Sequence, residues 1–146
     1  MADLVLTAAS VVPSAYAVIL SGTAGAAITA GQTIFEDTAD LDANGRPKIK
    51  LYDANASAPT AITNGVRGIA LNNAATGQPV DYAISDPDFT HGLAGVTKGD
   101  VIVASATAGG LAPVADLASG WRPAVMLIAT SSTKAVLQIA QNITAK

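Results

Sequence analysis

The sequence predicts a mainly β protein: a small single-domain β-barrel or β-sandwich with an extended N-terminal arm. Three observations favour this class. Val, Ile and Thr are frequent, whereas Glu36 is the only glutamate, and helical proteins usually carry many Glu and Lys residues. Where the apolar periodicity is clear, it is two residues. Short apolar runs are separated by turn residues along the chain, which is typical of sandwiches and small barrels.

The first element is an arm over residues 1–16, followed by one β domain over residues 17–146. The apolar run Leu4-Val5-Leu6 is short, and Pro13 interrupts whatever precedes Tyr16. Free in solution, such a terminal segment is expected to be disordered. Bound to a partner or a neighbouring subunit, it would add a strand to an open sheet edge, with Leu4 and Leu6 filling pockets from one face. Deleting residues 2–12 is then expected to leave a folded domain.

The strands follow in order, and turn residues separate them. Ser21-Gly22 ends the first strand. Asn44-Gly45 is expected to form the turn after the second strand, because Asn and Gly both tolerate positive φ. The third, beginning at Lys48, alternates polar and apolar residues, which predicts one solvated face. The expected strands are residues 17–20, 32–38, 48–52, 67–72, 80–84, 101–105, 124–130 and 135–140. Between them we expect loops at residues 53–64 and 131–134, an irregular segment at 85–95, and one helical turn at 116–120.

Several of these segments occur twice, which suggests an internal duplication. Residues 28–35 match residues 96–103, each an apolar-Thr-x-Gly-polar turn that leads into a β-branched run. The remaining matches pair the turns at 45–47 and 110–113, the strands at 66–71 and 121–126, and the strands at 80–84 and 135–139. A chain with 31 alanines also produces chance matches, so the duplication is a hypothesis for the structure to test.

Composition excludes several classes of function. The net charge is −3 and the eight Lys and Arg residues are scattered, which argues against a groove that follows nucleic-acid phosphates. The absence of cysteine excludes disulfides, thiolate metal sites and thiol catalysis, and suits assembly in a reducing cytoplasm. The apolar N-terminal region lacks the basic residues of a signal peptide, and Pro13 and Gly22 interrupt it, so no membrane span is expected.

The best candidate for chemistry is the segment containing Asp86, Asp88 and His91. Two carboxylates and the only histidine lie within six residues, and such groups can bind a metal. The favoured interpretation is turn chemistry, in which Asp side chains accept hydrogen bonds from nearby backbone N–H groups. No G-x-S-x-G or phosphate-loop pattern occurs. We therefore expect no catalytic site, no metal and no cofactor, and we expect His91 to be a dispensable turn residue.

A resemblance to a known family rests on the order of three motifs: residues 65–71, residues 77–80, and Lys98-Gly99-Asp100-Val101 followed by a closing hairpin. Over residues 25–140 the chain resembles the head decoration (cement) proteins of tailed bacteriophages. The resemblance implies a non-enzymatic protein on the virion surface, assembled in the host cytoplasm, that binds the major capsid protein at capsomer junctions. It also implies homotrimers, with dimers as the alternative. If the arm adds its strand to the capsid, the domain that lacks residues 2–12 is expected to decorate capsids weakly or not at all.

Candidate interface residues follow from the arm and from one large aromatic residue. They are Leu4, Val5, Leu6, Tyr16, Trp121 and Arg122. Trp and Arg dominate binding hot spots, but a Trp in an Ala-rich protein is also suited to plug the core, and for Trp121 we favour the core.

A carbohydrate- or ligand-binding β module of a phage tail or cell surface is the alternative function. It would need aromatic residues on one exposed face, and the chain offers Tyr16, Phe35, Tyr52, Tyr82, Phe89 and Trp121.

Overall fold

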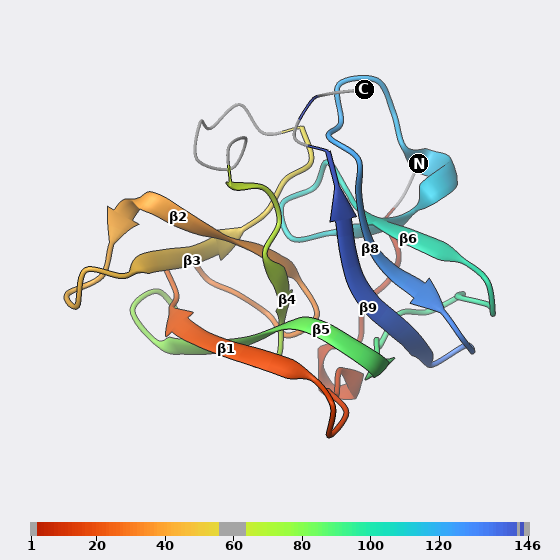
Figure 1. Ribbon diagram of the computed structural model, residues 1–146, viewed down its shortest axis with the longest axis horizontal. Coiled ribbons are helices and arrows are strands. Elements are labelled where there is room, and N and C mark those ends of the chain that lie inside the picture. Colours follow the sequence, from red (N-terminus) through yellow and green to blue (C-terminus); the bar gives the residue numbers. More distant parts are fainter. Residues whose placement is uncertain (1–2, 56–63, 143, 145–146) are drawn as a thin grey trace.

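The computed structural model describes residues 3–55, 64–142 and 144 and is mainly β (Figure 1). Strands account for 47% of these residues and helix for 5%, which confirms the predicted class. Nine strands of the described chain form one curled antiparallel sheet, a half-barrel. The elements are η1 (Ala8–Ser10), β1 (Val18–Thr23), β2 (Thr33–Leu41), β3 (Pro47–Leu51), β4 (Gly68–Ala70), β5 (Pro79–Thr90), β6 (Val101–Ala104), β7 (Leu111–Pro113), η2 (Val114–Asp116), β8 (Ala124–Ala129) and β9 (Lys134–Gln141).

Most predicted strands are present within a few residues of their expected bounds. β1, β2, β3, β4, β6, β8 and β9 all overlap the segments expected from the sequence. The predicted hairpin loop joins β8 to β9, where Thr130 and Ser131 each donate a backbone hydrogen bond to the Lys134 carbonyl. The loop expected at residues 53–64 lies mostly outside the described residues.

Three local predictions were wrong. The segment after Ile84, expected to be irregular, continues β5 to Thr90, and a bulge between Asp86 and Phe89 interrupts its pairing with β9. Pro87 lies in this bulge, where its missing N–H breaks no ladder hydrogen bond. The turn expected at residues 110–113 is instead largely the short strand β7, which pairs with β6. The helical turn expected at residues 116–120 is a 3₁₀ turn that begins earlier, at η2.

The strand order supports the predicted duplication. Reading from either end of the sheet, the order β3-β2-β4-β5 is repeated as β7-β6-β8-β9, and β5 pairs with β9 at the centre. β5 serves both copies: β1 pairs with residues 79–85 of β5, and β9 pairs with residues 85–90. Each repeat therefore contains five paired segments, and the second half of β5 plays in repeat 2 the part that β1 plays in repeat 1.

The first matched motif has the same geometry in both repeats. Gly31 donates its N–H to the Ala70 carbonyl at 2.7 Å, and Gly99 donates to the Ala129 carbonyl at 2.8 Å. Both glycines have φ above +90°, a conformation that L side chains rarely adopt, so the motif requires glycine there. The shared hydrogen bond also identifies Ala70 with Ala129 as equivalent positions.

The later sequence matches are shifted relative to the structure. Ile69 pairs with Ala83 in repeat 1, and Ile128 pairs with Val136 in repeat 2. Ile69 therefore corresponds to Ile128, whereas the match of residues 66–71 with 121–126 pairs it with Ala124. The match of residues 80–84 with 135–139 is likewise displaced, by two residues. The loops between the strands differ in length in the two repeats. The difference in residue number between equivalent positions therefore changes from strand to strand, which the sequence matches did not follow.

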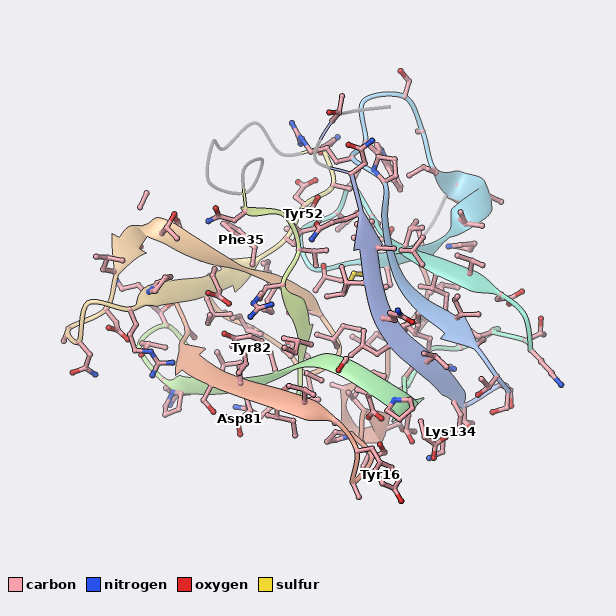
Figure 2. All side chains as sticks on the ribbon, viewed as in Figure 1. Tyr16, Phe35, Tyr52, Asp81, Tyr82 and Lys134 are labelled. Carbon is pink, nitrogen blue, oxygen red and sulfur yellow. The ribbon has the colours of Figure 1, made fainter. Side chains whose placement is uncertain are left out.

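Two hydrophobic clusters stabilise the fold. The smaller one fills the inside of repeat 1 and includes Ile34, Ile49 and Tyr82. The larger one includes residues of both repeats, among them Ile69 and Leu127. Figure 2 shows Tyr82 between the strands and Tyr16 projecting outward at the turn that precedes β1.

Candidate functional site

The N-terminal arm lies along the domain as an extended segment held by isolated β-bridges and backbone hydrogen bonds. The Leu4 N–H donates to the Leu111 carbonyl of β7 at 2.9 Å. On the other side of the arm, Leu6 forms an antiparallel bridge with Leu93, and the Ala94 N–H donates to the Val5 carbonyl at 2.9 Å. Residues 4–6 thus occupy a seam between β7 and residues 92–94, which we call the repeat-2 seam.

Repeat 1 closes the corresponding position without an added segment. There Ala24, just after β1, forms a bridge with Ile49 of β3, and Gly25 donates its N–H to the Ile49 carbonyl at 2.7 Å. Ile49 corresponds to Leu111 by register. The equivalent isoleucines Ile34 and Ile102 pair with Leu51 and Pro113, and Ile49 and Leu111 each lie two residues before that partner. In repeat 1 the Ile49 carbonyl accepts from Gly25, a residue of the same repeat. In repeat 2 the equivalent carbonyl accepts from Leu4 of the N-terminal arm.

The alternation predicted for the arm is present, but its partner differs from the prediction. Leu4 and Leu6 pack against the larger hydrophobic cluster, whereas Val5 between them is 70% exposed. Strand addition was expected on a capsid or a neighbouring subunit, and disorder was expected in the free chain. In the structure, the arm instead lies in extended form against its own domain, because the repeat-2 seam offers carbonyl and N–H groups to both of its edges.

A buried carboxylate fixes the end of the arm. Asp86, in the β5 bulge, is 1% exposed and accepts hydrogen bonds from three donors. The Ser14 N–H donates to Oδ2 at 2.7 Å, the Ser14 hydroxyl donates to Oδ1, and the Asp88 N–H donates to Oδ1 at 2.9 Å. Beside this anchor, Val12 and Thr90 exchange two backbone hydrogen bonds of 3.1 and 3.0 Å. The predicted Asp turn chemistry is present at Asp88, and the same carboxylate also binds a residue 72 positions away.

His91 directly follows β5, in the connection that leads to Leu93, and it is also buried, which the sequence did not indicate. It is 1% exposed, its Nδ1 accepts the Leu93 N–H at 3.0 Å, and its own N–H donates to the Thr133 carbonyl. Burial lowers the pKa of His91 from its ordinary value, and the nearby Ser131 backbone offsets this only in part. Nε2 is buried and makes no well-formed hydrogen bond within the described chain.

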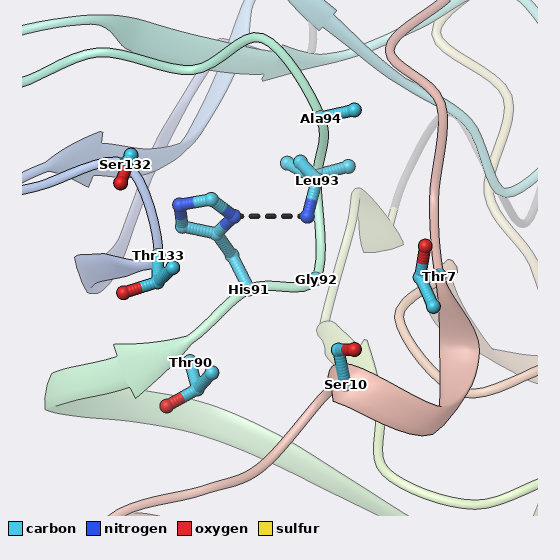
Figure 3. A pocket seen from close by; sticks show the side chains of 9 residues that line it. All are labelled: Thr7, Ser10, Thr90, His91, Gly92, Leu93, Ala94, Ser132 and Thr133. Carbon is cyan, nitrogen blue, oxygen red and sulfur yellow. Dashed lines mark hydrogen bonds between the residues drawn. The ribbon is translucent and has the colours of Figure 1, made fainter.

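A small pocket of about 220 Å³ lies beside His91 (Figure 3). Thr7 and Ser10 line it from the arm, and Ser132 and Thr133 line it from the β8–β9 hairpin. None of the lining residues other than His91 is titratable. Within the described chain, no three His, Asp or Glu side chains are placed to hold a metal ion.

An exposed apolar row crosses the outside of repeat 2. Val101, Ile128 and Val136 lie directly opposite one another on β6, β8 and β9, so their side chains share one face. Ile128 is 47% exposed, whereas its neighbours Leu127 and Ala129 are buried on the other face. The equivalent residues of repeat 1, namely Thr33, Ile69 and Ala83, are fully buried. We call the three repeat-2 residues the outer row.

Trp121 and Arg122 tie the segment before β8 to the domain. Trp121 is half-buried and packs against the larger cluster, as the core interpretation predicted. The Arg122 N–H donates to the Ala54 carbonyl at 2.7 Å. Of the six candidate interface residues, Leu4, Leu6 and Trp121 thus share one cluster, whereas Val5 and Tyr16 are exposed.

The sequence-based reasoning missed Asp86 as an anchor and did not single out the outer row. Val101, Ile128 and Val136 lie in continuous apolar runs, so the sequence shows no alternation that would mark one face as solvated. Which face of each strand meets solvent depends on how the repeats pack.

Comparison with known proteins identifies no family. A scan against protein-family models gave no match, and a search of curated proteins gave none either. No helix in the described ranges has the length and apolar character needed to cross a membrane.

Proposed function

We propose that this protein is a non-enzymatic decoration (cement) protein that binds the outer surface of a tailed-phage head at capsomer junctions and stabilises the shell. Its partners are then the major capsid protein and further copies of itself, as a homotrimer or a dimer, on a virion assembled in the host cytoplasm. The observation that carries this proposal is the outer row. Its equivalents in repeat 1 are fully buried, whereas in the described chain the outer row stays partly exposed, with Ile128 at 47%.

The outer row has the character of a weak, repeated contact. Burying one Val or Ile side chain contributes about 1.5–3 kcal/mol, and these three side chains are already partly covered. One copy would therefore bind weakly. Many copies on one shell, each touching its neighbours, would bind together far more tightly. This suits a protein whose binding partner is a lattice.

The placement of the aromatic residues does not favour the carbohydrate-binding alternative. Phe35, Tyr52, Tyr82 and Phe89 are buried, and Trp121 packs against the core. Tyr16 remains as the exposed aromatic residue, at 78% exposure. A sugar-binding face built from stacked aromatic rings would need more than one exposed ring on the same surface.

The test is co-sedimentation of the purified chain with heads of the phage that encodes it, before and after DNA packaging. We expect saturable binding to matured heads and a higher temperature of head disruption. Ile128→Lys is expected to weaken this binding strongly. Val114→Lys, which changes an exposed apolar residue on η2, is the matched control and should bind as the unmodified chain does. Absence of the chain from purified particles, or equal binding by both variants, would overturn the proposal.

A further inference from the structure

The arm is an addition to the repeat and not part of it. Repeat 1 joins the end of β1 to β3 through its own backbone, at Gly25 and Ile49. In repeat 2 the equivalent acceptor, the Leu111 carbonyl, receives the Leu4 N–H from the arm. The segment that completes repeat 2 thus comes from a remote part of the chain, and the repeat-2 seam is a binding site for an extended peptide.

Nothing in the arm's contacts requires that it belong to the same molecule. The contacts of residues 4–12 are backbone hydrogen bonds and apolar packing, and the chain has no charged residue from Leu4 to Phe35. The arm of a second copy, having the same sequence, would make the same contacts in this seam. Exchange of an identical element between copies is a low-cost route to oligomers.

The connection between the arm and β1 is suited to a crossing between copies. It is the segment from Pro13 to Ala17, in which the Ala17 N–H donates to the Ser14 carbonyl and the Tyr16 N–H donates to the Ser14 hydroxyl. Ser14 also donates to the buried Asp86, and in the exchanged form this bond is made to the Asp86 of the copy that receives the arm. Exposed apolar side chains gather at both ends of this connection. They are Val12, Tyr16, Val18 and Ile19. In an exchanged arrangement two such connections would meet, and these side chains would cover one another.

We propose that the arm is exchanged between copies of this chain, so that residues 3–12 of one copy occupy the repeat-2 seam of another. The buried apolar surface at the connection, absent from the closed monomer, favours the exchanged form once the protein is concentrated. Reciprocal exchange closes a dimer, and cyclic exchange closes a larger ring. This proposal concerns self-association and does not depend on capsid binding.

The chain has no cysteine, so engineered cysteines can report the exchange without background. Leu6 and Leu93 are a suitable pair. The flanking bonds, from the Ala94 N–H to the Val5 carbonyl and from the Thr7 N–H to the Gly92 carbonyl, identify them as a non-hydrogen-bonded antiparallel pair. Such pairs have Cα atoms about 4.5 Å apart, within the range of a disulfide.

The experiment mixes Leu6→Cys with Leu93→Cys under mild oxidation and separates the products on a non-reducing gel. Exchange predicts that about half of the protein in an equal, randomly assorted mixture becomes a disulfide-linked pair containing one chain of each variant. Val5→Cys mixed with Leu93→Cys is the matched control, because Val5 is adjacent but points to solvent. It should give only a small fraction of linked pairs. Equal yields from the two mixtures would mean random collision and would overturn the proposal.

A second measurement covers the case in which a single variant folds poorly. The unmodified chain is expected to be oligomeric by light scattering at high concentration. The double variant Leu6→Cys/Leu93→Cys, oxidised at low concentration so that each arm is locked in its own seam, is expected to stay monomeric at that same high concentration. If the unmodified chain is monomeric throughout, or the locked chain forms the same oligomer, arm exchange is refuted. The number of chains in the ladder formed by oxidising the double variant at high concentration gives the ring size.

Discussion

Replacing Asp86 with alanine should destabilise the fold much more than replacing Asp88, the other acidic residue of the β5 bulge. Asp86→Ala removes the acceptor for the Ser14 N–H, the Ser14 hydroxyl and the Asp88 N–H. A hydrogen bond to a charged group contributes about 1.5–3 kcal/mol net. The three share one carboxylate and Ser14 is only half-buried, so the contributions are not additive and water can replace part of them. We expect a loss of about 3 kcal/mol.

The assay is urea unfolding followed by the fluorescence of Trp121, the only tryptophan, which packs against the larger cluster. A loss of that size should also lower the melting temperature by about 10 °C in a chain of this length. Asp86→Asn retains one acceptor oxygen and should lose roughly half as much stability.

Asp88→Ala is the control in the same bulge. The Asp88 carboxylate is exposed and lies 3.4 Å from the Lys134 ammonium, and surface ion pairs of this kind contribute about 0–1 kcal/mol. If Asp86→Ala and Asp88→Ala destabilise the protein equally, the buried carboxylate is not an anchor for the arm.

Three further predictions follow from the same contacts. Deleting residues 2–12 should cost about 4 kcal/mol in urea unfolding, through the lost apolar packing of the arm, and a truncated chain as stable as the full one would restore the free-arm interpretation. Burial lowers the pKa of His91 below its unfolded value near 6.5, so the neutral imidazole stabilises the fold fully above pH 6.5 and this stabilisation is lost as the pH falls below 6.5. His91→Gln should therefore flatten the dependence of the unfolding free energy on pH between about pH 7 and pH 5. An unchanged slope would contradict this. Ile128→Lys should change the free energy of unfolding by less than about 0.5 kcal/mol, whereas Ile69→Lys, at the equivalent buried position, should prevent folding or cost more than about 4 kcal/mol; similar effects at the two positions would show that the outer row is covered.

Local features of the fold could be predicted from the sequence because local physics determines them. The Thr-x-Gly turns at Gly31 and Gly99 need a residue that accepts positive φ, and the β-branched runs after them suit strands. β5 shows the limit of this reasoning. Its Ser-Asp-Pro-Asp segment has the composition of a turn, but pairing with β9 on one side and the arm on the other holds it as a bulged strand.

The site could not be predicted to the same extent, because it depends on long-range packing. Asp86 and Ser14 are separated by 72 residues, and nothing in either segment indicates the other. Ile69 and Ile128 are both isoleucines in short strands, yet one is fully buried and the other is 47% exposed. The difference arises because repeat 1 packs one face against repeat 2, while the equivalent face of repeat 2 meets no further repeat within the described residues.

The position of the arm restricts how it could contribute to capsid binding. If residues 4–6 left the repeat-2 seam to grip another protein, the Leu111 carbonyl and the Leu6 packing site would be exposed, and the free energy gained at the capsid would first have to offset that loss. Exchange between copies removes this cost, because each seam receives an arm as another arm leaves. The arm cannot lie in its own repeat-2 seam and bind the capsid at the same time, so these two placements of the arm compete. Binding through the outer row avoids the conflict, since Ile128 is exposed, and Val101 and Val136 are partly exposed, while the arm stays in place. Under the two proposals the surfaces therefore have separate roles: the arm would join copies, and the outer row would meet the shell.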